Sequence, residues 1–148
     1  MLFKLDKNIS RPVVVLDKYK DCLALLDTGA EVPVWTDSEN LLRYVYKARL
    51  VKAQEKFYGF GGATYGNLYR IPQFILGTLV YPDLPIIAVN DSRVPFSMIL
   101  SASMFSRLTY EINDRDKYLR ITVPEGESTV RHLEIKDSNG RLHILCNH

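Results

Sequence analysis

The chain has 148 residues, 47% of them hydrophobic and 24% charged, and these proportions fit one ordinary globular domain and exclude a disordered chain. Nineteen basic and seventeen acidic residues leave a net charge of +2, which gives no electrostatic reason to expect nucleic acid or a membrane surface as a partner. The first ten residues lack the apolar core of a signal peptide, and no stretch is long enough for a membrane span, so we expect a cytoplasmic protein.

The first part of the sequence reads as short strands separated by turn residues. The β-branched run RPVVVLD at 11–17 is followed by the turn KYKD, and the apolar runs CLALLD at 22–27 and VPVW at 32–35 come next. Runs of this length, bounded by charged and small residues, are typical of buried strands. We therefore expect three strands before residue 36.

A helix is expected directly after these strands. Thr36, with Glu39 three residues later, fits a capping box, in which the two side chains bond the first backbone N–H groups of a helix. Leu41, Leu42 and Val45 continue at helical spacing. The pattern predicts one apolar stripe that faces the core.

The rest of the chain is expected to consist mainly of hairpins. The segment 55–76 reads as two strands around a glycine-rich tip, and two further hairpins turn at 113–116 and at Asn139–Gly140. Between them lie a strand at 84–90 and a second short helix at 101–106. The expected architecture is one all-β domain with one or two short helices.

The tripeptide Asp27-Thr28-Gly29 closes an apolar strand and is followed by a small residue, Ala30, and a second apolar strand. Asp and Gly are common turn residues, so a plain strand end followed by a turn is the simple interpretation. The alternative interpretation is that this carboxylate, hydroxyl and glycine form half of a catalytic site.

The segment ALLDTGAEVPVW at 24–35 resembles the catalytic loop of the retropepsin family, the single-domain aspartic proteases of retroviruses and their cellular and bacterial relatives. Three other segments resemble that family in the same order. RPVVV at 11–15 is similar to its N-terminal strand, GFGG at 59–62 to its flap tip, and MILSASMF at 98–105 to its second apolar motif. The resemblance covers roughly residues 11–113 and implies a retropepsin-like closed barrel with a glycine-rich flap hairpin.

The resemblance implies an aspartic endopeptidase with Asp27 as the catalytic residue and Thr28 and Gly29 as supports of the active site. Hydrolysis of a peptide bond in this way needs a water held between two carboxyls, one ionised and one protonated. The sequence holds a single Asp-Thr-Gly, so we expect a symmetric homodimer that brings two copies of Asp27 together. No cofactor and no metal are expected.

The flap implied by the resemblance consists of Gly59, Phe60, Gly61 and Gly62. Such a lid closes on an extended peptide or protein substrate, excludes water and donates backbone hydrogen bonds. Phe60, at the tip, is expected to touch the substrate or the partner's flap. A plain surface hairpin is the alternative.

Four apolar residues occupy positions that line the substrate pocket in the family pattern: Ala30, Val32, Phe96 and Ile99. Their other interpretation is ordinary core, because small and branched apolar residues next to strands are commonly buried. Both interpretations stay open on the sequence.

The chain departs from the family pattern at several positions. Ser101 stands where a glycine is usual, Ala102 where viral members often carry an arginine that pairs the dimer, and Glu31 where they commonly carry aspartate. Arg11 is still expected to reach Glu31 of the other subunit, as an exposed pair of little energetic weight. The domain is expected to span 1–148, with 114–148 as a C-terminal extension of the core.

These departures keep a second function open. A changed dimer support at Ser101 and Ala102 would misplace the aspartates, so the alternative is a dimeric peptide-binding or regulatory module on the same fold with little or no proteolytic activity. The intact Asp-Thr-Gly argues against it, since a binding module need not keep the aspartate.

The remaining polar residues give weaker signals. His132 and His143 are placed to pair across the last hairpin, but two histidines without a third ligand make a poor zinc site, and His148 adds no recognisable spacing. Cys22 and Cys146 lie far apart, and we expect free thiols in a reducing compartment rather than a disulfide.

Overall fold

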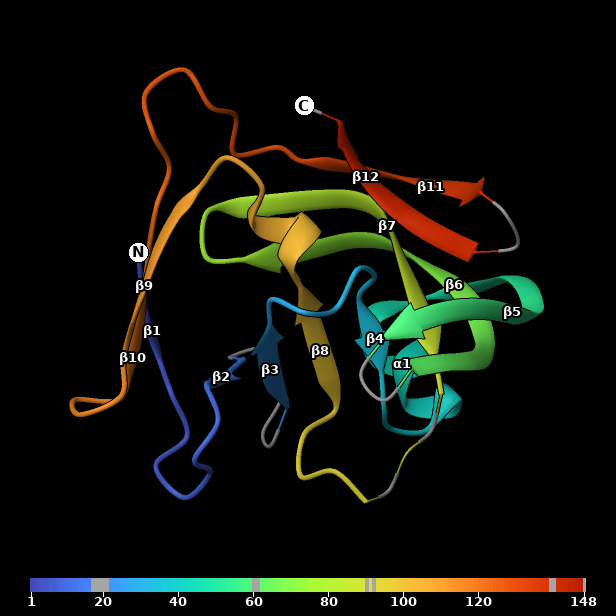
Figure 1. The fold of residues 1–148 in the computed structure, drawn as a ribbon, viewed down its shortest axis with the longest axis horizontal. Helices are drawn as coiled ribbons and strands as arrows, with labels where there is room; N and C mark the ends of the chain where they lie inside the picture. The colour runs from blue at the N-terminus through green and yellow to red at the C-terminus, as the bar shows by residue number, and fades with distance from the viewer. Residues whose placement is uncertain (17–21, 60–61, 90, 92, 139–140, 148) are drawn as a thin grey trace.

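The computed structural model describes residues 1–16, 22–59, 62–89, 91, 93–138 and 141–147. In this part of the chain strands dominate, with one α-helix, α1 (Glu39–Tyr46), and one short 3-10 helix, η1 (Ala102–Phe105), which confirms the expected all-β class (Figure 1). The strands are β1 (Leu2–Lys4), β2 (Val13–Val15), β3 (Leu23–Asp27), β4 (Val34–Trp35), β5 (Arg49–Gly59), β6 (Gly62–Leu76), β7 (Leu79–Ala88), β8 (Met98–Ser101), β9 (Thr109–Asn113), β10 (Tyr118–Thr122), β11 (His132–Ser138) and β12 (Arg141–Asn147).

The strands form two sheets. The smaller has the order β1-β10-β9, and the larger has the order β11-β12-β5-β6-β7-β4-β8-β3-β2. The order of the larger sheet is linear, and no pairing between described residues joins β11 to β2. The closed barrel implied by the resemblance is therefore not confirmed, although the class is.

One crossing in the larger sheet places the candidate site. Strand β8 lies between β3 and β4, parallel to β3 and antiparallel to β4. The chain that leaves β3 must pass over the end of β8 before it enters β4, and Figure 1 shows this loop running across the upper end of β8. Because β3 and β8 are parallel, their carboxyl ends meet there, with Asp27 opposite Ser101.

The central strands β3 and β8 are apolar up to their last residue, and most of their side chains are buried. All four residues of β8 are buried, and so are Ala24, Leu25 and Leu26 of β3. Continuous rather than alternating apolar runs are typical of such strands. An aromatic row extends this core, in which the ring of Tyr46 packs edge-on against Trp35, with ring centres 5.9 Å apart, and tilted against Phe74, with ring centres 5.6 Å apart.

Helix α1 begins later than the capping box predicts. Ser38 is the N-cap, and its hydroxyl accepts a hydrogen bond from the Leu41 N–H at 3.2 Å. Thr36 is buried at the end of β4, and its hydroxyl donates to the Phe96 carbonyl at 2.6 Å. The prediction of Thr36 as the cap was wrong, because a more distant carbonyl takes its hydroxyl.

The apolar stripe of α1 is confirmed in part. Leu42, Val45 and Tyr46 are buried, whereas Leu41 is 37% exposed. The helix ends at Lys47, whose φ of 55° is left-handed and closes the helix without a glycine.

Among the described residues, no helix has the length and apolar character needed to cross a membrane.

The three predicted hairpins are all present. In the first hairpin β5 pairs with β6, from Arg49 opposite Arg70 to Gly59 opposite Gly62. In the other two, β9 pairs with β10 and β11 pairs with β12. The tip of the first hairpin, residues 60–61, and the expected Asn139–Gly140 turn of the last lie outside the described residues. β7 begins at Leu79, well before the expected start at residue 84.

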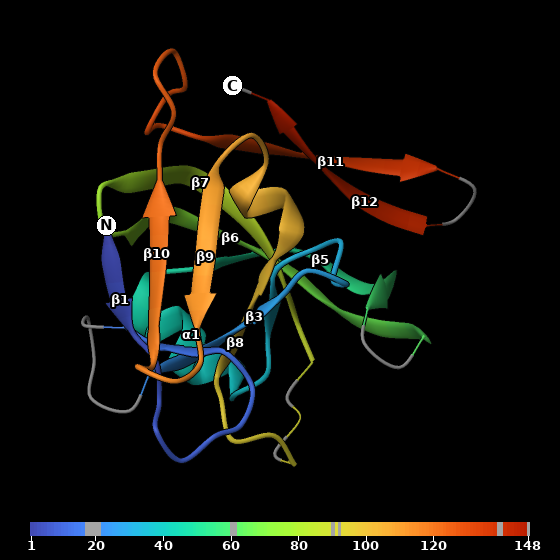
Figure 2. The same ribbon diagram turned by 60° about the vertical axis from the view of Figure 1, so that its left-hand side comes forward.

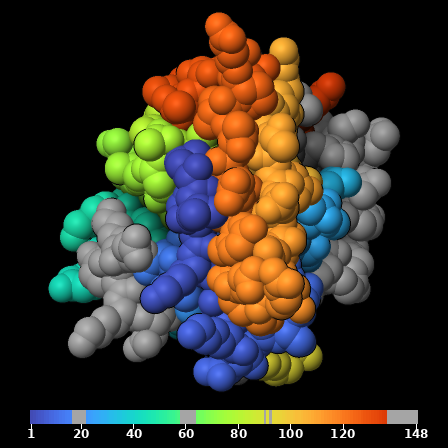
Figure 3. Space-filling view, turned by 90° about the vertical axis from the view of Figure 1, so that its left-hand side faces the viewer, coloured from blue at the N-terminus to red at the C-terminus, as the bar shows by residue number. Residues whose placement is uncertain are grey.

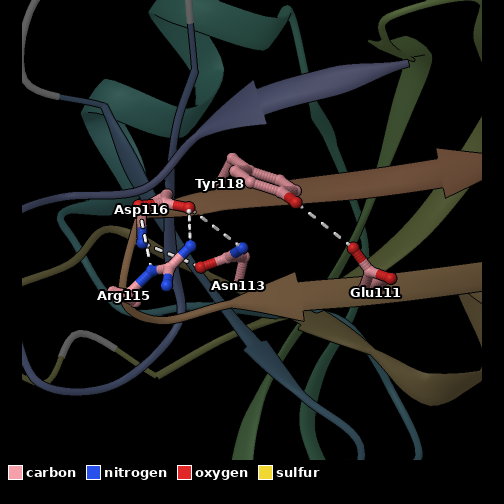
Figure 4. Close-up of polar contacts among 5 residues, drawn as sticks. All are labelled: Glu111, Asn113, Arg115, Asp116 and Tyr118. Atoms are coloured by element: carbon pink, nitrogen blue, oxygen red, sulfur yellow. Dashed lines mark hydrogen bonds and ion pairs between the residues drawn. The ribbon is translucent and has the colours of Figure 1, made fainter.

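Residues of the C-terminal extension form part of both sheets. β10 lies between β1 and β9, and these three strands run side by side on one face of the molecule (Figure 3). The turn between β9 and β10 is closed by local polar contacts, in which Asn113 Oδ1 accepts from the Asp116 N–H at 2.8 Å and Arg115 pairs with Asp116 (Figure 4). In the larger sheet, β12 pairs with β5 at Phe57.

Candidate catalytic site

Asp27 is the last residue of β3, and its carboxylate is oriented by its own loop. Its Oδ1 accepts a hydrogen bond from the Gly29 N–H at 2.9 Å, and its carbonyl accepts one from the Ala30 N–H at 3.1 Å. A side-chain oxygen that bonds the N–H two residues ahead makes a compact turn. The half-buried carboxylate is thereby held at the end of a rigid, buried strand.

The glycine in the tripeptide has a steric reason. A Cβ at Gly29 would lie 3.2 Å from Asp27 Oδ1, which is closer than ordinary van der Waals contact. A side chain at this position would require the carboxylate to shift by a few tenths of an ångström. Thr28 and Gly29 are exposed in the single chain, and the supporting role expected of Thr28 stays a prediction.

Two hydrogen bonds join the loop after Asp27 to the junction of β8 and η1. The Ala102 N–H donates to the Ala30 carbonyl at 3.2 Å, and the Ser103 hydroxyl donates to the Glu31 carbonyl at 3.2 Å. Ser101 is fully buried, and its hydroxyl lies 2.7 Å from that of Ser103. Ser101, which departs from the family pattern, is thus part of a chain of hydrogen bonds that reaches the loop after Asp27.

Ser103 is a supporting residue that sequence reasoning missed. The sequence offers only one sign of this role, its position two residues after Ser101 at the end of an apolar strand. Two serines at that spacing do not by themselves indicate a functional site. Its contact with the Glu31 carbonyl spans 72 positions of the chain, so only the fold brings the two together.

The four residues expected to line a pocket are buried in the core of the single chain. Ala30 and Val32 are each 1% exposed, Phe96 is 7% exposed, and Ile99 is fully covered. This burial agrees with their interpretation as core, and their role as pocket walls stays a prediction. Of the four flap residues, Gly59 and Gly62 face each other as the last described pair of the hairpin, while Phe60 and Gly61 lie outside the described residues.

The other candidate groups are not assembled into a site. His132 lies opposite Asn147 and His143 opposite Lys136 in the last hairpin, so the two histidines are not cross-strand neighbours there. Within the described residues, no three or more His, Cys, Asp or Glu side chains form a group that would hold a metal ion. Cys22 is a buried free thiol whose pKa is raised by burial, with its Sγ 3.6 Å from the Tyr46 hydroxyl.

Comparison of the chain with protein-family models, with curated proteins and with solved structures finds no match. The function proposed below therefore rests on the geometry around Asp27 and on the resemblance of the motifs.

Proposed function

We propose that this protein is a retropepsin-like aspartic endopeptidase that acts as a homodimer on peptide or protein substrates. The observation that carries the proposal is the setting of Asp27. Its carboxylate ends a buried central strand, is fixed by the Gly29 N–H, and lies beside an exposed turn that a second copy can approach. The crossing over β8 and the β5–β6 hairpin support the proposed retropepsin-like fold.

The case for a second copy rests on the single Asp-Thr-Gly of the sequence and on the ion pairs of four other aspartates among the described residues. Asp83 pairs with Arg49 and Arg70, Asp91 pairs with Arg93, and Asp114 and Asp116 pair with neighbours in the β9–β10 turn. None of these four ends a buried strand in the way that Asp27 does. A mechanism with two aspartates is therefore completed most simply by Asp27 of a second chain.

The proposed reaction uses one water and two carboxyls. The ionised Asp27 takes a proton from the water while the oxygen bonds to the peptide carbonyl carbon, and the protonated Asp27 of the partner subunit donates to the carbonyl oxygen. Collapse of the tetrahedral intermediate breaks the C–N bond, and the amine leaves with a proton from the dyad. In each copy the Gly29 N–H keeps the plane of the carboxyl fixed.

The shared site is tested by mixing chains. Three parts of the Asp27→Asn variant and one part of wild type are unfolded and refolded together, and cleavage of unfolded casein is measured per wild-type chain. A wild-type chain then finds a wild-type partner about one time in four, so its activity falls to about a quarter. Unchanged activity, in a mixture shown by native mass spectrometry to contain mixed dimers, would contradict the shared site.

The pH dependence of cleavage is expected to be bell-shaped, with its maximum at acidic to mildly acidic pH. One carboxyl must be charged and the other neutral, so the rate falls when both lose their proton and when both gain one. A statine-type mimic such as pepstatin is expected to inhibit, and chelators and serine-directed reagents are expected to have no effect. Loss of activity with a chelator would contradict the metal-free mechanism.

The second candidate function is a dimeric peptide-binding module that does not cleave. Two departures from the family pattern favour it. Ser101 places a buried hydroxyl where the family has a glycine, and Ala102 stands where viral members often have an arginine. Retention of an extended peptide by the wild-type chain, without cleavage at any pH between 3 and 8 (roughly, the range in which carboxyl dyads work), would favour this alternative.

A further inference from the structure

The β5–β6 hairpin separates from β7 at a definite residue, while its β5 edge stays paired with β12 and Phe57 is fully buried. β6 pairs with β7 from Leu76 as far as Asn67, whereas it pairs with β5 as far as Gly62. The part beyond Asn67, made of residues 52–59 and 62–66, is called the distal arm below. Figure 2 shows the hairpin projecting away from β1, β9 and β10. Its outer edge pairs with β12 at Phe57.

The two strands of the hairpin are irregular at this same point. Their register shifts on both sides of Lys52, and Gln54 has a left-handed φ of 58°. The Gln54 N–H donates to the side chain of Asn67 at 3.1 Å rather than to a ladder carbonyl. Bulges of this kind bend a hairpin and twist it locally, so the base of the distal arm is a bend that a side chain bridges.

The base is also closely packed on β7. A Cβ at Gly66 would come within 2.5 Å of Ile87 Cγ2 and 2.7 Å of the Ala88 carbonyl oxygen. Only glycine fits this close approach without a shift of β7, so the base of the distal arm lies directly against β7.

A carboxylate from helix α1 holds this bend. Glu39 Oε1 accepts from Asn67 Nδ2 at 2.9 Å and from the Tyr69 hydroxyl at 2.6 Å. Asn67 is thus bonded on both sides, to Glu39 through its nitrogen and to Gln54 through its oxygen. The Arg43 guanidinium lies 5.3 Å from the centre of the Tyr69 ring and adds a favourable charge beside the carboxylate.

The protonation states agree with a permanent contact. The bond from Tyr69, followed by that from Asn67, lowers the pKa of Glu39, while burial, followed by the bond to Glu39, raises the pKa of Tyr69 to about 12. Glu39 is therefore charged and Tyr69 remains a donor across neutral and mildly acidic pH. The charge assistance to these hydrogen bonds is present at neutral pH and is lost as the pH falls through the lowered pKa of Glu39.

We infer that Glu39 is a positioning residue, which anchors the base of the distal arm to α1 through Asn67 and Tyr69 and so limits the motion of the arm. The consequence for substrate rests on the proposed function, in which the arm is the flap. The anchoring itself does not rest on it.

The test is amide hydrogen exchange on the full chain, with variants that separate the hydrogen bonds from the charge. Glu39→Ala and Tyr69→Phe are expected to speed exchange in residues 52–59 and 62–66 roughly tenfold, since each removes a charge-assisted bond at the base. Glu39→Gln keeps an acceptor oxygen and is expected to restore exchange to near the wild-type rate.

The chain offers a matched control. In the β9–β10 hairpin the Tyr118 hydroxyl donates to Glu111 Oε1 at 3.3 Å, so Tyr118→Phe removes a bond between the same two groups from another hairpin (Figure 4). This variant is expected to leave exchange in the distal arm unchanged. Distal-arm exchange within twofold (roughly, the spread of such rates) of wild type in both Glu39→Ala and Tyr69→Phe overturns the inference. An equal acceleration in β3 and β8 overturns it too, because it marks a general loss of stability.

Cleavage kinetics separate this inference from the proposed function. With Glu39→Ala, the KM for a peptide substrate is expected to rise about fivefold and kcat to change less than about twofold, because a less firmly anchored arm is less often in the position that binds substrate. If wild type cleaves and the KM of this variant is unchanged, the link between Glu39 and the flap is overturned. If wild type does not cleave, only the proposed function fails, and the exchange rates still decide the anchoring.

Discussion

Replacement of Asp27 by asparagine is expected to lower the rate of peptide cleavage by a factor of roughly 1000 or more, while the protein remains folded. The amide has nearly the shape of the carboxylate, and its Oδ1 still accepts the hydrogen bond from the Gly29 N–H. It cannot take a proton from water, so the base of the proposed mechanism is removed without disturbing the loop. The measurement is digestion of unfolded casein by purified variant and wild type.

A matched control is available in the first turn of the chain. Asp6 Oδ1 accepts from the Asn8 N–H at 2.8 Å, the same two-residue turn that Asp27 makes with Gly29. Asp6→Asn is expected to leave cleavage unchanged, which separates loss of a catalytic carboxyl from loss of an aspartate turn. Undiminished cleavage by a folded Asp27→Asn variant would reject the catalytic role of Asp27.

Replacement of Arg131 by alanine is expected to lower the free energy of unfolding by roughly 3 kcal/mol or more. Arg131 precedes β11, is fully buried, and donates from Nε to the Met104 carbonyl at 3.3 Å and from its terminal nitrogens to the carbonyls of Ser106 and Ser128. Its loss opens a cavity at the end of η1 and removes three charge-assisted hydrogen bonds, although the Met104 carbonyl keeps the Tyr81 hydroxyl as a donor at 2.7 Å. Through these contacts Arg131 joins the C-terminal extension to η1, and η1 directly follows Ser101 below the candidate site.

Urea unfolding of Arg131→Ala, Arg131→Met and Arg115→Ala provides the measurement. Arg115 is 87% exposed and lies in the β9–β10 turn, so its replacement is expected to change stability by less than about 0.5 kcal/mol. Methionine fills most of the volume of the arginine stem but donates no hydrogen bonds, so most of the loss is expected to persist in Arg131→Met. Equal midpoints for wild type and both Arg131 variants would show that the carbonyl contacts contribute nothing.

Much of the local structure was predictable because it depends on neighbours in the sequence. The apolar runs in β3 and β8 mark buried strands, since both faces of these strands must be covered. The turn at Asp27 is also local, because the carboxylate bonds an N–H only two residues ahead. Catalytic, flap and dimer roles remain proposals, as they depend on substrate and on a second chain.

The errors and omissions of the sequence reasoning come from contacts between distant segments. Thr36 and Ser38 both have the chemistry of a helix cap, and the choice fell to Ser38 because the hydroxyl of Thr36 is bonded to the Phe96 carbonyl, 60 positions away. Glu39 fitted a capping box, yet its carboxylate bonds Asn67 and Tyr69 at the base of the β5–β6 hairpin.

Taken by itself, the sequence determined the all-β class, the three hairpins and the Asp-Thr-Gly turn, because these follow from residue spacing and from bonds within a few positions. Only the tertiary structure decided that β8 enters between β3 and β4, that Ser103 holds the Glu31 carbonyl, and that Arg131 is buried against the end of η1. Residue periodicity encodes which face of an element is apolar. It carries no information on which distant donor meets which acceptor, and that pairing is set by the packing of the whole chain.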